Sequence, residues 1–163
     1  MITIYIQKLK PGDDGHAAGR ALLAKVVGDK ALITGPKGKP YAADGSVFFN
    51  ISHCDGAVGV AVAGQEVGLD LEPAERVVKR KGFTGRNDPD LPPIRLWVLK
   101  ESLVKWGGDG ILALRGARIK PLGQNRYQGR YRDKEALLQA FEYEGLVGAL
   151  CCETDQEYEI KEM

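Results

Sequence analysis

Two acidic residues near the middle of the chain, Asp70 and Glu72, have the spacing of a metal-binding pair. They belong to the stretch Val-Gly-Leu-Asp-Leu-Glu at residues 67–72, which reads as a strand. Because side chains alternate along a strand, Leu69 and Leu71 share one face and the two carboxylates share the other. Carboxylates on one face can converge on one small cation. The alternative is an ordinary pair of solvated acidic side chains.

A third carboxylate lies on a helix that we predict over residues 94–106 and expect to be buried. The apolar residues of this segment recur at helical spacing, and Glu101 continues one of their stripes. A carboxylate in an apolar stripe needs a partner, because burial of an unpaired charge is costly. One partner is Lys105, which lies four residues further along the helix. The other interpretation places Glu101 with the two strand carboxylates around a shared cation.

Strands and helices in a mixed order must position these residues. A helix is predicted over residues 16–27, with an aspartate before it as N-cap and Gly28 at its end. The stretch 73–93 is irregular, with a short helix around 76–81 as an alternative. For residues 132–138, a helical turn is the alternative to strand. Alternation and turn residues predict strands at 2–6, 47–52, 57–63, 67–72, 115–120, 126–132, 138–144, 146–152 and 157–161.

This order of elements predicts an α+β fold with antiparallel sheets, built from two similar small α/β halves. Tight turns join the three strands between residues 47 and 72, which we expect to form an antiparallel meander. A chain of 163 residues fits one domain. Its approximate halves are residues 1–72 and 93–163, joined by a linker at 73–92.

Composition narrows the class of protein. The net charge of +1 gives no global field suited to nucleic acid. The chain has neither an apolar run of membrane-spanning length nor a signal-peptide pattern at its start. Its cysteines, Cys54, Cys151 and Cys152, fit neither a disulfide framework nor a zinc motif, so we expect reduced thiols in the cytoplasm. A nucleophilic Cys54–His53 pair is disfavoured, because neighbours in a strand point apart.

Two basic segments lie in loops. Lys37 and Lys39 stand in a stretch rich in glycine and proline at residues 35–41, where a phosphate could approach the backbone. The second segment runs from Arg76 to Arg86 and carries five lysines and arginines. It is either a solvated face or a docking patch for an acidic partner.

Four stretches of the sequence resemble the motifs of one enzyme family. They are FNISH at 49–53, VGLDLE at 67–72, WVLKESLVKWG at 97–107 and, upstream, GKP at 38–40. In order and spacing they look like the patterns F-N-x-S-H, V-G-x-D-x-E, W-x-x-K-E-[AS]-x-x-K and G-K-P of the 4′-phosphopantetheinyl transferases of the Sfp type. The chain is shorter than is usual for that family, and its segment after Glu72 lacks the family's Phe-Phe-rich pattern.

The resemblance implies transfer of the 4′-phosphopantetheine moiety of coenzyme A to a serine of an apo carrier protein, with release of adenosine 3′,5′-bisphosphate. It also implies a pseudo-dimeric 4′-phosphopantetheinyl transferase fold with the site between its halves. The implied Mg²⁺ ligands are Asp70, Glu72 and Glu101. In the implied catalytic set, Asp70 and Lys105 join Glu101, and Glu101 or a carboxylate-held water takes the serine proton. The implied coenzyme A contacts are Lys39, Ser52, His53, Lys100 and Lys105.

The partners expected on this basis are coenzyme A and an acidic carrier protein, which would face the basic stretch from Arg76 to Arg86. Neither nucleic acid nor membrane is expected as a partner, and the protein is expected to be a monomer, because one chain carries both halves. One alternative is a shortened relative that binds coenzyme A or a carrier protein without transfer. Another is an unrelated metal-dependent phosphoesterase that uses the same carboxylates.

Overall fold

A computed structural model describes residues 1–163, apart from the side chain of Ile111, and has an α+β fold with mostly antiparallel sheets. The fold class expected from the sequence is therefore confirmed at this level. The elements are β1 (Ile2–Lys8), α1 (Gly15–Val27), β2 (Leu32–Thr34), β3 (Pro40–Ala42), β4 (Phe48–Cys54), β5 (Ala57–Ala63), β6 (Val67–Pro73), α2 (Pro93–Trp106), η1 (Ile111–Gly116), β7 (Ala117–Gly123), β8 (Arg126–Tyr131), β9 (Lys134–Tyr143), β10 (Leu146–Cys152) and β11 (Tyr158–Glu162).

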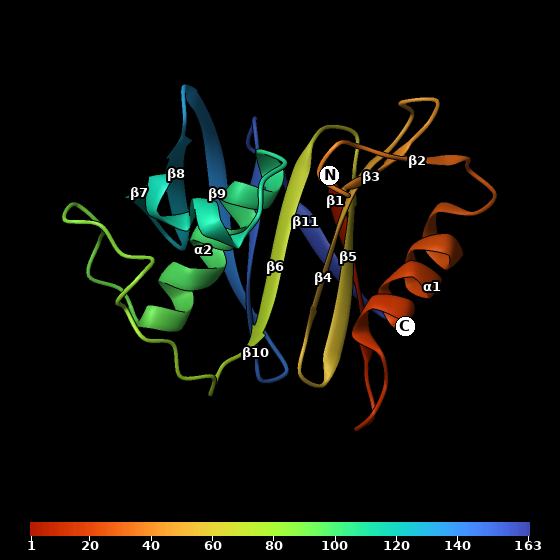
Figure 1. The fold of residues 1–163 in the computed structure, drawn as a ribbon, viewed down its shortest axis with the longest axis horizontal. Helices are drawn as coiled ribbons and strands as arrows, with labels where there is room; N and C mark the ends of the chain where they lie inside the picture. Colours follow the sequence, from red (N-terminus) through yellow and green to blue (C-terminus); the bar gives the residue numbers. More distant parts are fainter.

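The strands form two main sheets and one small hairpin. The first sheet has the order β11-β1-β5-β4, in which only β1 and β11 run parallel. The second sheet has the order β6-β10-β9-β8-β7 and is antiparallel throughout. The hairpin β2–β3 stands apart from both. In Figure 1, α1 covers the outer side of the first sheet and α2 packs against the second.

Three apolar clusters hold these layers together. The first lies between α1 and the strands β4 and β5, and the second lies between α2 and the strands β7 to β10. The third joins the two sheets to each other, with side chains of β1 and β5 packed on those of β6, β9 and β10. The fold is thus a stack of helix, sheet, sheet and helix.

Strand β6 leaves the first sheet, so the expected meander of three strands is wrong. Only β4 and β5 pair, whereas β6 pairs with β10 in the second sheet. Side chains of β4 take the place of a backbone ladder, since Asn50 Oδ1 accepts from the Leu69 N–H at 2.9 Å and Ser52 Oγ from the Leu71 N–H at 3.0 Å. The β4 and β6 edges of the two sheets are therefore joined by buried polar side chains.

The division of strands between the two sheets does not follow the expected division of the sequence into halves 1–72 and 93–163. β6, at the end of residues 1–72, belongs to the second sheet, and β11, near the end of the chain, belongs to the first. Each sheet nevertheless has the same local connection. In the first sheet, β1 leads into α1, and β5 returns to pair antiparallel with β1. In the second sheet, β6 leads into α2, and β10 returns to pair antiparallel with β6.

Most other elements lie where the sequence predicts them. The side chain of Asp14 caps α1 by accepting from the N–H groups of His16 and Ala17, and Gly28 ends the helix. Residues 76–81 are irregular and do not form the short helix considered above. Residues 134–138 belong to β9, so the helical turn considered there is also absent from the described chain. The alternating burial of β9 explains the difference, because that period favours a strand.

Helix α2 lies unusually close to β6. A Cβ atom at Gly68 would be 2.0 Å from the carbonyl oxygen of Ser102 and 2.8 Å from the Trp106 nitrogen, so only glycine fits there. The eight residues of α2 that are buried include Lys100 and Glu101, which confirms that the helix is buried. Among the described helices, none is both long and apolar enough to cross a membrane.

Gly68→Ala should therefore destabilise the protein by about 2–3 kcal/mol, because backbone atoms of α2 cannot move aside as a flexible side chain could. Urea denaturation of both proteins measures this difference. Gly64→Ala is the matched control, since a Cβ atom at Gly64 meets nothing within 4 Å. Equal midpoints for the two variants would contradict the close packing of α2 on β6.

Candidate functional site

The carboxylate of Asp70 is buried where β6, β4 and α2 meet. The residue is 4% exposed. Its Oδ1 accepts hydrogen bonds from Lys105 Nζ at 2.7 Å and from Ser52 Oγ at 3.1 Å. Its Oδ2 is buried and has no hydrogen-bond partner among the described residues. An unpaired buried carboxylate oxygen is costly, so this atom is positioned for a ligand that the polypeptide does not supply.

Glu72 follows on the same face of β6 and contacts a different cation. Its carboxylate accepts from Arg76 Nη1, four residues later. Burial raises the pKa of Glu72, and the neighbouring Asp70 charge raises it further. The guanidinium of Arg76 also lies 5.2 Å from the centre of the Trp97 ring, where a cation is attracted to the aromatic face. Arg76 thus connects the acidic site to the exposed loop after β6.

Glu101 approaches the same region from α2. It is 8% exposed, and burial raises its pKa to about 7, with the Asp70 charge as the next contribution. Lys105 acts in the opposite direction but does not outweigh these effects. A carboxyl group with a pKa near neutrality can exchange a proton at physiological pH, which suits a general acid or base.

Lys105 is the cation at the centre of this site. Besides Asp70, its Nζ contacts the carbonyl oxygen of Leu69 at 3.2 Å and Ser52 Oγ at 3.3 Å. Burial alone would lower the pKa of Lys105, but the Asp70 carboxylate and the two glutamates outweigh burial and raise it. The ammonium is therefore retained. Of the two interpretations of the helix carboxylate, the ion pair between Lys105 and Glu101 is not formed, because Lys105 pairs with Asp70.

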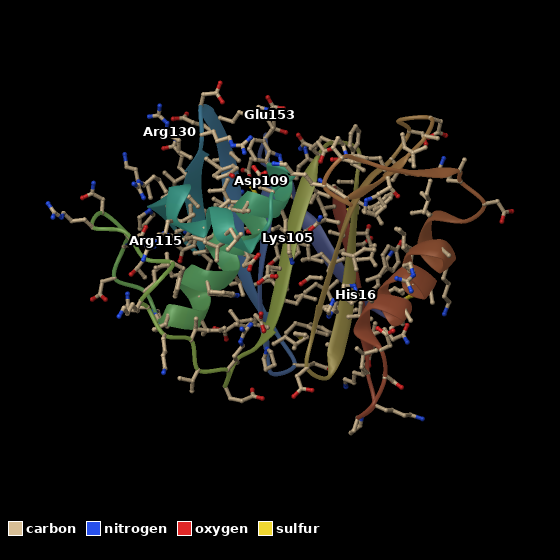
Figure 2. All side chains as sticks on the ribbon, viewed as in Figure 1. His16, Lys105, Asp109, Arg115, Arg130 and Glu153 are labelled. Atoms are coloured by element: carbon tan, nitrogen blue, oxygen red, sulfur yellow. The ribbon has the colours of Figure 1, made fainter. Side chains whose placement is uncertain are left out.

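A cavity of about 600 Å³ opens beside Lys105. Its walls come from α1, the β2–β3 hairpin, β4 and the last turn of α2, and its basic side chains are His16, Arg20, His53 and Lys105. The imidazole rings of His16 and His53 meet edge to face at 4.3 Å. Burial and the nearby His16 and Lys105 lower the pKa of His53. Figure 2 shows His16 beside α1 and Lys105 where α2 meets β6.

Lys39 lies on the hairpin that borders this cavity. Its Nζ is 2.6 Å from Glu66 Oε2, and its side chain is largely buried. Lys37, two residues earlier, pairs with the buried carboxylate of Asp109 beyond α2. These two ion pairs fix the hairpin across the opening. Lys37 and Lys39 both border a smaller hollow that also includes Lys105.

Lys100, which the resemblance places at a coenzyme A phosphate, does not line this cavity. The residue is completely buried, and its Nζ donates to Asp88 Oδ2 at 2.6 Å and to the Phe83 carbonyl at 2.8 Å. It fixes the loop before α2 to the helix. Lys100 and Glu101 are adjacent on the helix and therefore point in different directions.

No sequence motif includes His16, which reads as a surface histidine, and no clear motif includes Arg20, yet both line the cavity. Glycines on α1 are the signal that could have indicated them. A Cβ atom at Gly15 would be 2.8 Å from His53 Nδ1, and one at Gly19 would be 2.8 Å from Ile51 Cγ2. Small residues therefore bring α1 against β4. Cys54 is no nucleophile here, because burial raises the pKa of its thiol to about 12.

The three carboxylates have the hard oxygen donors that Mg²⁺ prefers. They are close enough for each glutamate's pKa to respond to Asp70. They do not form a closed coordination set, however. Within the described residues, no group of three or more His, Cys, Asp or Glu side chains is arranged to hold a metal ion. The carboxylate oxygens are therefore of the chemical type that Mg²⁺ prefers. Two of the three carboxylates already form ion pairs within the protein, Asp70 with Lys105 and Glu72 with Arg76.

No protein-family model matches the chain, and a search of curated proteins also finds no match.

The raised pKa of Glu101 predicts a stability that depends on pH in the absence of metal. Below its ordinary pKa of 4.5 the carboxyl group is protonated in both states, so it contributes nothing. Between pH 4.5 and about 7 the unfolded chain loses this proton first, so stability should fall as pH rises, by up to roughly 3 kcal/mol. Urea denaturation in a chelating buffer at several pH values measures the slope.

Glu101→Gln should flatten that slope, because the amide does not titrate. Glu75→Gln, at an exposed position, is the control and should keep the wild-type slope. A Glu101→Gln protein with the wild-type slope would show that this carboxyl group titrates normally.

Proposed function

We propose that this protein is a Mg²⁺-dependent 4′-phosphopantetheinyl transferase of the Sfp type. The observation that carries the proposal is the buried Asp70 carboxylate with one unpartnered oxygen, flanked by Glu72 and Glu101 beside a basic cavity. The sequence stretches that resemble the family's motifs supply this arrangement from β4, β6 and α2. The repeated connection of strand, helix and returning strand supports the pseudo-dimeric form of that fold.

Coenzyme A is the proposed donor substrate. Its phosphates require cations. Arg20 and Lys105 supply positive charge around the cavity, and His16 and His53 can do so when protonated. The cavity lies within the size range of small-molecule sites. Lys39 borders the adjoining smaller hollow, where its ammonium is paired with Glu66. In this proposal the pyrophosphate lies nearest Lys105, and the nucleotide end lies toward α1.

The proposed reaction is attack of the carrier serine oxygen on the phosphorus that bears the pantetheine arm. A new P–O bond forms, the bridging P–O bond breaks, and adenosine 3′,5′-bisphosphate leaves with the bond's electron pair. Glu101, or a water held by one of the carboxylates, takes the serine proton as general base. Lys105 offsets the developing charge on the phosphoryl oxygens. Bound Mg²⁺, held by Asp70, Glu72 and Glu101, would neutralise the pyrophosphate.

A carrier protein is the proposed acceptor. Arg76, Lys79, Arg80 and Lys81 are exposed on the loop that follows Glu72, so an acidic carrier would meet positive charge next to the site. The exposed Val77 adds an apolar contact within this loop.

A second function, binding without transfer, is favoured by one observation. Lys105 and Arg76 already neutralise Asp70 and Glu72, so the site is stable as an internally paired cluster. A protein of this kind would bind coenzyme A or a carrier but would not need the metal.

The experiment that separates these functions is intact-mass spectrometry of a panel of apo carrier proteins incubated with this protein, coenzyme A and Mg²⁺. The proposal expects the mass of one phosphopantetheine to be added to at least one carrier, and the gain to disappear when the metal is chelated. Coenzyme A binding without any mass gain would instead support the binding-only function.

Asp70→Asn should lower the transfer rate by more than about a hundredfold, because it removes a charged donor from the reacting site. The same mass assay measures the rate, and coenzyme A binding shows that the variant is folded. Glu75→Gln, just beyond β6, should transfer at the wild-type rate. Near-normal activity of Asp70→Asn would remove this carboxylate from the mechanism.

Arg76→Ala should strengthen binding of Mn²⁺, used as a spectroscopic substitute for Mg²⁺, a few-fold and up to about tenfold, because Glu72 no longer has a competing cation. Electron paramagnetic resonance titration measures free Mn²⁺ directly. Lys79→Ala removes the same charge from the same loop without touching Glu72 and is the control. An equal effect of both variants would show that only overall charge matters.

A further inference from the structure

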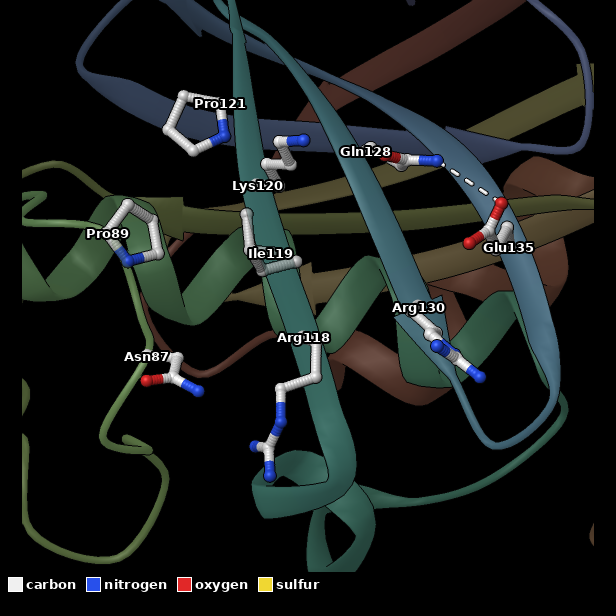
Figure 3. Close-up of a pocket in the computed structure, with 9 residues that line it drawn as sticks. All are labelled: Asn87, Pro89, Arg118, Ile119, Lys120, Pro121, Gln128, Arg130 and Glu135. Carbon is white, nitrogen blue, oxygen red and sulfur yellow. Dashed lines mark hydrogen bonds between the residues drawn. The ribbon is translucent and has the colours of Figure 1, made fainter.

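The outer end of the second sheet has an exposed face on the side opposite α2. Ala117 and Ile119 of β7 point into the core with α2, so Arg118 and Lys120 point the other way. On β8, Arg130 is exposed in the same manner. The first sheet covers this side only over β6, β9 and β10. Figure 3 shows the remaining surface, with the basic side chains on neighbouring strands. We call Arg118, Lys120 and Arg130 the outer basic face.

Two of the basic side chains of this face lie on paired strands. Arg118 and Arg130 are directly opposite each other in the β7–β8 register. Like charges in that position repel, since directly opposed side chains start only about 5 Å apart. The one acidic residue that lines the hollow is Glu135, which is directly opposite Arg130 in the β8–β9 register and whose Oε2 accepts a hydrogen bond from Gln128 Nε2 at 3.2 Å. Arg118 Nη1 donates to the Arg115 carbonyl at 2.9 Å, and its other guanidinium nitrogens have no hydrogen bond among the described residues. Folding does not require two opposed arginines on an exposed sheet face, whereas a ligand with negative charge would use both.

The face is also concave. A hollow of about 370 Å³ lies over β7 and β8, and Asn87 and Pro89 of the loop before α2 form its rim. Asn87 and Gln128 add amide donors to the guanidinium groups around it. Arginine forks bind carboxylates through two parallel hydrogen bonds, so two neighbouring arginines fit two carboxylates that are close together.

We propose that the outer basic face docks an acidic segment of a partner protein. Neighbouring carboxylates on one side of a helix or strand have the spacing that the opposed arginines require. A nucleic acid fits less well, because the charge is local in a protein of net charge +1 and the described lining residues include no aromatic side chain for base stacking. The face lies away from α1 and the large cavity: in Figure 2, Arg130 and His16 lie toward opposite ends of the molecule. The proposal is therefore independent of the proposed transfer reaction.

The test is fluorescence anisotropy with a fluorescein-labelled peptide of alternating glutamate and alanine. The wild-type protein should bind it, with an affinity that falls as salt is added. The double variant Arg118→Glu/Arg130→Glu should bind at least about tenfold more weakly. The control is Lys10→Glu/Lys25→Glu, which changes net charge equally at exposed positions of the other half and should retain most of the affinity. Circular dichroism checks that both variants are folded.

Three results would overturn the proposal. An equal loss of peptide affinity in the two double variants would show that only net charge matters. Unchanged affinity in both would show that the peptide binds outside the outer basic face. Tighter binding of a labelled single-stranded RNA, lost in Arg118→Glu/Arg130→Glu, would assign the face to nucleic acid. Should the double variant fail to fold, Arg130→Gln/Lys120→Gln replaces it, with Lys10→Gln/Lys25→Gln as the control of equal charge, and the same comparison applies.

Discussion

The close contact of α2 with β6 at Gly68 is the constraint on which the site depends. Without a side chain at this position, the helix backbone lies directly on the strand. That approach places Glu101 and Lys105 next to the acidic face of β6. A larger residue would push the helix outward and separate the two sources of charge, even if each element kept its own structure. The geometry of the site thus follows from the absence of one side chain.

The charges gathered by this contact are nearly balanced within the protein. Three carboxylates, on Asp70, Glu72 and Glu101, face two cations, on Lys105 and Arg76. The remaining imbalance appears as the raised pKa of Glu101 and the unpartnered oxygen of Asp70. Burial makes both effects strong, because little water remains to solvate a surplus charge. A cluster of this kind can be stable alone and still have capacity for an added cation.

The sequence predicted local structure well because local structure depends on local patterns. Alternation located β6 and the shared face of Asp70 and Glu72, and helical spacing located α2. What the sequence could not predict was pairing between distant segments. The partner of β6 is β10 rather than β5, because β1 and β4 already pair with the two edges of β5. Likewise, the burial of Lys100 and the approach of His16 to His53 depend on the packing of loops and helices, which periodicity does not describe.

The parallel pairing of β1 with β11 has a consequence for how the protein forms. Ile2 lies opposite Tyr158, so one edge of the first sheet joins segments from the two ends of the sequence. The hairpins of the second sheet join neighbouring segments and can close early, whereas this edge must wait for a very long loop to close. During synthesis, β1 is made before β11, so this edge of β1 stays open until β11 follows. Protection of that edge by chaperones would matter most in this interval.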